Sequence, residues 1–181
     1  MNNSLKVLFD EHEIITGAIE TARSAKRLIG INDEEYELAI SELIRFFRVY
    51  ADQYHHHKEE EILFPEMAKK NDLLADGILK EMYDHHTWFR EMLRAIELDF
   101  EHKQYVAASE KMDEYTEALL DHIAVENEEL FQTAYTLFTD DELENIYFRF
   151  VDLDRELGDS KKVDISKLIG ELNLEINEIN N

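Results

Sequence analysis

Apolar residues recur at helical spacing along most of this chain, and few residues in it break a helix. The first such stretch, over residues 4–29, carries its apolar side chains at one-turn and two-turn intervals, as in Leu5, Leu8 and Ile15. Proline occurs once and glycine five times in 181 residues. The many turns of a β-sandwich or β-barrel would need more of both. The sequence therefore predicts long helices joined by few connections, and no strands.

The spacing predicts four long helices and a shorter fifth, over residues 4–29, 33–69, 76–101, 104–137 and 140–157. Pro65 lies inside the second helix and is expected to kink it or to end it near Phe64. Thr139 and Glu142 form a capping box that starts the fifth. The fold class predicted is all-α, an up-down-up-down four-helix bundle with an additional C-terminal helix. We expect a domain over residues 1–158 and a tail over 159–181 that is either a docked helix or frayed.

The charge and composition exclude several classes of partner. The formal net charge is −23, from 42 acidic and 19 basic residues. Such a chain repels phosphate backbones and anionic lipids, so no nucleic acid or membrane partner is expected. Cysteine is absent, which excludes disulfides and thiolate metal sites. No signal peptide or membrane-spanning stretch is evident, so a cytoplasmic location is expected.

Two histidine–glutamate pairs stand out. The run "YHHHKEEEILFP" covers Tyr54–Pro65, and in it His55 and Glu59 are four residues apart. His122 and Glu126 repeat that spacing in "HIAVENEELF". Residues four apart share one face of a helix, so a single metal ion could contact both members of a pair.

The other two long helices also carry histidine. The first helix has His12 in "DEH", and the third has His85 and His86 in "DHH". A helix rises about 1.5 Å per residue, so distances can be counted from each connecting turn. The count brings all these residues to one level of the bundle, whereas unrelated surface histidines would lie at scattered depths. Imidazole and carboxylate donors suit iron, manganese or zinc, and their number favours two ions over one.

The motifs "DEH", "HHHKEEEILFP", "DHHTWFR" and "HIAVENEELF" together resemble the hemerythrin-like HHE cation-binding domain, over about residues 5–157. The resemblance implies a four-helix bundle around a non-haem di-iron centre. The ligands that it implies are His12, His55, Glu59, His86, His122 and Glu126. Further ligands, or groups that surround the ligands, are expected at His56, Glu60, His85 and Tyr54. The implied cofactor is two iron ions, while manganese and zinc accept the same donors.

The chain departs from the oxygen-carrying hemerythrins at two points. Those proteins have a second third-helix histidine four residues after the first, where this chain has Phe89 and Arg90. They also place the fourth-helix carboxylate five residues after its histidine, where this chain has Asn127. A redox, repair or sensing role is therefore favoured over reversible oxygen storage.

Three functional hypotheses follow. The first is a non-haem di-iron protein that binds or reduces a small oxidant, namely dioxygen, peroxide or nitric oxide, with peroxidase-type or oxidoreductase-type activity left open. The second is an iron or redox sensor, or an interaction module, without catalytic turnover. The third is a plain structural bundle whose histidines hold no metal. The oligomeric state stays open, with a homodimer among the options.

Overall fold

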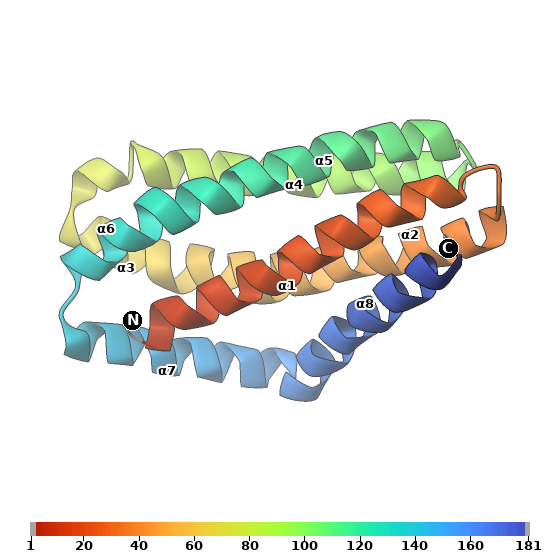
Figure 1. The fold of residues 1–181 in the computed structure, drawn as a ribbon. Helices are drawn as coiled ribbons and strands as arrows, with labels where there is room; N and C mark the ends of the chain where they lie inside the picture. Colours follow the sequence, from red (N-terminus) through yellow and green to blue (C-terminus); the bar gives the residue numbers. More distant parts are fainter. Residues whose placement is uncertain (1–2, 180–181) are drawn as a thin grey trace.

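The computed structural model describes residues 3–179, and the chain is helical through nearly all of that range (Figure 1). The α-helices are α1 (Asn3–Ala25), α2 (Asp33–Phe46), α3 (Phe64–Lys70), α4 (Ile78–Glu101), α5 (Tyr105–Val125), α6 (Phe131–Leu137), α7 (Asp140–Leu157) and α8 (Asp159–Ile179). No strand occurs between residues 3 and 179. Within the same residues, no helix is long and apolar enough to span a membrane.

Two of the four long helical runs change their winding partway. π-helical segments at Phe47–His56 and Glu59–Leu63 join α2 to α3, and a third at Glu126–Leu130 joins α5 to α6. The two runs lie lengthwise with α1 and α4, and α7 and α8 lie against α1 (Figure 1). The prediction of an all-α bundle with further helix after it is confirmed for the described residues, while the up-down-up-down order stays a prediction.

The helix boundaries follow from a few local signals. Gly30 adopts a positive φ of 74°, which only glycine adopts readily, and it ends the first helical run. The side chain of Asn32 then accepts a hydrogen bond from the N–H of Glu35 at the start of α2. The predicted capping box of Thr139 and Glu142 is present at the start of α7.

The second helical run does not end at Pro65. In the π-helical segment the N–H of Phe64 bonds to the carbonyl of Glu59, five residues back. Pro65 has no N–H to continue this pattern, and the carbonyl of Glu60 instead accepts a hydrogen bond from the hydroxyl of Tyr83 at 3.1 Å. The chain thus passes its one proline by changing helical register, and α3 continues to Lys70.

Two hydrophobic clusters fill the bundle. One lies towards the end that holds the start of α1, and it includes Leu8, Met82 and Phe131. The other lies towards the opposite end and includes Ile15 and Phe89. Along α1 and α4, His12 and His86 fall between members of the two clusters. The histidine–glutamate level is therefore a buried polar layer between two apolar ones.

Residues 159–179 form a docked helix, α8. Ile165, Ile169 and Ile176 of α8 are buried and belong to the larger hydrophobic cluster. Burying them accounts for a helix whose periodicity in the sequence is weak. Of the predicted division into residues 1–158 and 159–181, residues 1–2 and 180–181 lie outside the described range, and the division stays a prediction.

The phenol of Tyr54 joins the second helical run to the α7–α8 junction. Its hydroxyl lies 2.9 Å from the carbonyl oxygen of Leu157 and 2.8 Å from that of Gly158, and one proton is shared between them. We expect Tyr54→Phe to lower the free energy of unfolding by about 1–2 kcal/mol, because two partly buried carbonyls lose their donor. Chemical denaturation would measure it. Tyr147→Phe is the control, and equal effects of the two changes would contradict this role.

Candidate metal centre

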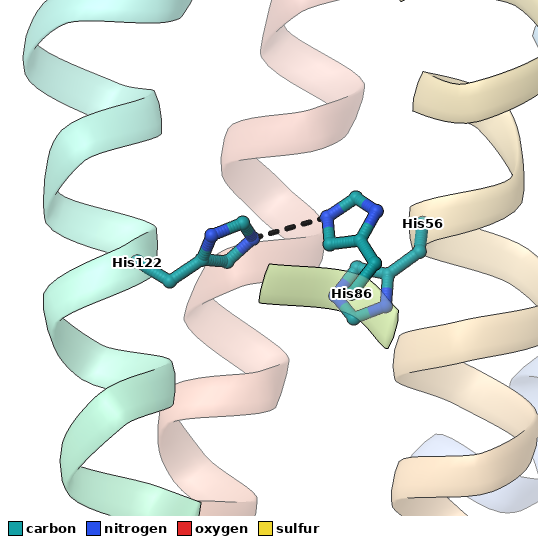
Figure 2. A group of neighbouring side chains, drawn as sticks. All are labelled: His56, His86 and His122. Atoms are coloured by element: carbon teal, nitrogen blue, oxygen red, sulfur yellow. Dashed lines mark hydrogen bonds between the residues drawn. The ribbon is translucent and has the colours of Figure 1, made fainter. Parts of the chain in front are cut away.

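The structure gathers seven buried side chains into two adjoining clusters. His12, His55, Glu59 and Glu126 form the first, and His56, His86 and His122 form the second, shown in Figure 2. Within each cluster, one donor atom of every residue lies within 4.8 Å of the others. All six residues predicted as ligands are included, and His56 joins them. These two groups are called the four-residue cluster and the three-histidine cluster below.

Both carboxylates of the four-residue cluster also face the three-histidine cluster. The Oε2 atom of Glu126 lies 3.2 Å from Nε2 of His12, and its Oε1 lies 3.3 Å from Nε2 of His122. The Oε2 atom of Glu59 lies 3.6 Å from Nε2 of His55 and 3.7 Å from Nε2 of His86. Each carboxylate therefore has histidines of both clusters beside it, which is the arrangement of a bridging ligand.

Many of the inward-facing atoms have no hydrogen-bond partner within the described chain. They are Nε2 of His12 and His55, Nδ1 of His56, and both carboxylate oxygens of Glu59 and Glu126. Leaving so many polar atoms buried without partners is costly, and proteins do so rarely. A cation placed among them would satisfy the nitrogen lone pairs and the carboxylate charge together. The donor set fits iron, manganese or zinc.

The outer nitrogens of the first cluster's histidines are occupied. Nδ1 of His12 lies 2.9 Å from Oδ1 of Asn127, and Nδ1 of His55 lies 3.0 Å from Oε2 of Glu11. Each Nδ1 therefore donates its hydrogen outward, which turns the Nε2 lone pair inward. Such outer partners fix the ring orientation and tautomer of metal-binding histidines. Asn127 thus holds His12 instead of entering the cluster.

The same arrangement recurs in the three-histidine cluster. Nδ1 of His86 donates to Oε1 of Glu60 at 2.8 Å, and Nδ1 of His122 lies 3.3 Å from Nδ1 of His85. Glu60 and His85 therefore contact rings of the cluster from outside. The inner Nε2 atoms of His86 and His122 face each other at 3.2 Å (Figure 2). Two nitrogens each ~2.1 Å from one ion stand about that far apart.

His56 lies inside the three-histidine cluster. Its ring stacks on that of His86, with centroids 3.9 Å apart and planes 13° apart. Its Nδ1 lies 3.6 Å from Oδ1 of Asp52, too far for a hydrogen bond. The π-helical winding of this stretch lets adjacent residues His55 and His56 contribute to different clusters. Tyr54 is directed instead to the α7–α8 junction.

Burial and neighbours set the charge of the site. Burial, then the neighbouring histidines, lowers the pKa of His55 and of His86 well below the usual value. Burial also lowers the pKa of His122, to about 4, although Glu126 opposes the shift. These rings are therefore neutral at pH 7 and their lone pairs are free. Burial would raise the pKa of Glu126, but His122 and His12 beside it lower it to about 2.

Glu59 titrates in the opposite sense. Burial, followed by the charges of Glu126 and Glu11, raises its pKa well above 4.5. Without a cation, the ionised form of Glu59 is disfavoured beside its ionised neighbour. A bound cation would remove this penalty, because it supplies the positive charge that the two carboxylates lack.

The sequence interpretation missed a buried ion-pair network behind His55. Lys58, which is fully buried, places Nζ 2.9 Å from Oε1 of Glu11 and 2.5 Å from Oδ1 of Asp154. Lys162 of α8 contacts the same Glu11 and lies 2.7 Å from Oδ2 of Asp154. The positions of Lys58 in the histidine run and of Glu11 beside His12 were available signals. Nothing in the tail sequence marks Lys162.

The fold and these clusters define a class of protein, a helical bundle with buried histidine and carboxylate groups suited to cations. The family described as the hemerythrin HHE cation-binding domain matches residues 3–134. The chain therefore belongs to this family, and the resemblance seen in the motifs is confirmed. The match contains both clusters but not α7 or α8. Neither a search of curated proteins nor a search of solved structures finds a match to the chain.

Glu59→Gln is expected to stabilise the metal-free protein and to weaken metal binding. The raised pKa means that ionised Glu59 costs stability as the pH rises above 4.5, and glutamine removes that charge. At pH 7 the melting temperature should rise by about 3 °C or more. Near pH 4, where the unfolded carboxyl also binds a proton, the gain should disappear. Thermal melts in chelator measure this.

Exposed Glu61 supplies the control for Glu59, because Glu61→Gln removes the same charge from the same helical segment. It should leave the melting temperature of the metal-free protein almost unchanged. A Glu59→Gln protein that melts lower than wild type at pH 7 would contradict the assignment.

Proposed function

We propose that this chain is a non-haem di-iron protein that binds or reduces a small oxidant, such as dioxygen, peroxide or nitric oxide. One observation carries the proposal. Two buried carboxylates, Glu59 and Glu126, lie between two sets of histidines, and their oxygens have no hydrogen-bond partner among the described residues. Family membership supports a cation in this position.

The proposed ligands divide between two ions. His12 and His55 would hold one, and His86 and His122 the other, with His56 as the further histidine of the second. Glu59 and Glu126 would bridge the two. Iron is proposed as the metal, and manganese and zinc suit the same donors. Bound iron would supply an open coordination position and electrons for the oxidant.

The protein's own residues would orient the metal-binding histidines and restrict the access of water to the site. Glu11 and Asn127 hold the outer nitrogens of His55 and His12. A 360 Å³ pocket reaches His122, and mainly apolar side chains line it, among them Trp88 and Phe89. Such a lining favours a small neutral molecule over an ion. The pocket supports a diatomic gas or peroxide as the ligand.

Other features are proposed on sequence grounds alone. They are the up-down-up-down order of the four long helices, a domain division at residues 158–159, a cytoplasmic location and the lack of a nucleic-acid partner. Peroxidase-type turnover is included among the activities open to the proposed centre.

The protein loaded anaerobically with ferrous iron should hold about two irons per chain. His122→Ala should lose about one of them, because the second ion keeps fewer nitrogen donors. Metal analysis measures the number of irons per chain. Absorption spectra recorded before and after exposure to air or azide measure whether the iron centre binds these ligands. His57→Ala is the control, because His57 lies in the histidine run of the second helical run but outside both clusters. A wild-type chain that takes up no iron would sink the proposal.

A sensing role is the second candidate, and the ion-pair network favours it. Glu11 contacts His55 on one side and Lys162 of α8 on the other. A cation that draws on the lone pair of His55 polarises its ring, which strengthens the hydrogen bond to Glu11. Metal binding would thereby stabilise the docking of α8, which lies outside the family match.

Removing the metal should therefore increase amide hydrogen exchange in α8 by about tenfold or more. Lys162→Met should abolish this dependence on metal, while Lys161→Met, an exposed neighbour, should preserve it. Hydrogen-exchange mass spectrometry of metal-loaded and chelated protein provides the measurement. Exchange in α8 that is identical with and without metal would argue against sensing through this helix.

A further inference from the structure

A second pocket reaches the three-histidine cluster from a different side. It has a volume of 240 Å³, and His56 and Tyr115 are among its lining residues. Phe89 lines both this pocket and the apolar 360 Å³ pocket, so the two pockets share one wall residue beside the cluster. Their linings differ in charge, which indicates different ligands.

The 240 Å³ pocket concentrates positive charge on a very acidic protein. Arg48, Arg90 and Arg94 all line it, three of the eight arginines in a chain of net charge −23. Asp52 is the single acidic residue in the lining. Elsewhere the protein's field repels anions, so a guanidinium ion that no carboxylate neutralises creates a place where an anion is attracted.

The three arginines differ in how far they are neutralised. Arg48 makes two hydrogen bonds to Glu97, at 3.0 and 2.7 Å. Arg90 donates to Asp52 at 2.7 Å and to Glu60 at 2.8 Å. Arg94 has no hydrogen-bond or ion-pair partner among the described residues, and it is exposed at the pocket. All five of its N–H donors are therefore free for a ligand.

Tyr115 adds an unused donor to this pocket. The residue as a whole is 2% exposed, and its hydroxyl makes no hydrogen bond within the described chain. The hydroxyl is not among the fully buried unpaired atoms, so a ligand in the pocket can reach it. Burial also raises the pKa of Tyr115, so the group keeps its proton and can donate it to an acceptor. An anion is the strongest acceptor that could occupy the pocket.

We propose that this pocket binds a small inorganic oxyanion of about the size of nitrite, held by the free guanidinium of Arg94 and the hydroxyl of Tyr115 beside His56. Charge-assisted hydrogen bonds from a guanidinium and an O–H donor are the strong, directional contacts that select oxyanions. Arg90, fixed by two carboxylates, shapes the wall. The site is made of protein groups alone, so it does not depend on the proposed metal function. Through this pocket an anionic ligand would reach the three-histidine cluster separately from a neutral ligand in the 360 Å³ pocket.

The test is a nitrite titration of the full chain, in chelator and in the iron-loaded form, at constant ionic strength set with a bulky organic anion. The side-chain N–H resonance of Arg90, which every variant keeps, reports binding by NMR. We expect a saturable shift in the wild type. Arg94→Gln should weaken nitrite binding about tenfold, and Tyr115→Phe should weaken it about threefold or more.

Arg45→Gln is the matched control. Arg45 precedes Arg48 by one helical turn, pairs with Glu42 on the surface and does not line the pocket, so its loss removes the same charge nearby. It should change the affinity less than about twofold. Equal affinities of the Arg94→Gln and wild-type proteins, or no saturable shift in the wild type, would overturn the proposal.

The nitrite experiment and the iron-uptake experiment can succeed or fail independently of each other. Nitrite binding that depends on Arg94 in a chain that takes up no iron would support the anion site and defeat the di-iron proposal. Iron uptake without saturable nitrite binding would support the di-iron proposal and defeat the anion site.

Discussion

The contact between Glu59, Glu126 and the histidines on either side of them is the constraint around which the structure is organised. Seven polar side chains are buried here, and many of their atoms find no partner among the described residues. Such a layer is tolerated when a cation completes it and when apolar packing holds it in place. The two hydrophobic clusters, one on each side of the layer, provide that packing.

The local winding of the helices serves the same layer. π-helical segments occur where the second run carries His55, His56 and Glu59, and where the fourth carries Glu126. An inserted residue changes which side chains face inward, at the cost of weaker hydrogen bonding. The winding brings neighbouring histidines to different clusters, and it also lets the helix pass Pro65 without ending.

The C-terminal helices relate to the site in a way that family membership does not describe. α7 and α8 lie outside the family match, yet Asp154 and Lys162 close a buried ion-pair network on Glu11 behind His55. Buried ion pairs of this kind are costly to break, because removing one partner leaves the other charge unsatisfied. The network thus ties α8 to the orientation of a proposed ligand, His55.

The sequence by itself determined the helices and six of the seven residues of the clusters. Helical periodicity with one proline fixed the elements, and the spacing of His55 with Glu59 and of His122 with Glu126 fixed which side chains share a face. Tertiary structure alone decided that His56 enters a cluster, that Asn127 and Glu11 orient rings, and that Arg94 and Tyr115 meet at one pocket. The spacing of residues along a helix shows only which of them share a face of that helix. Register shifts in π-helical winding and contacts between distant helices depend on packing, which no local pattern records.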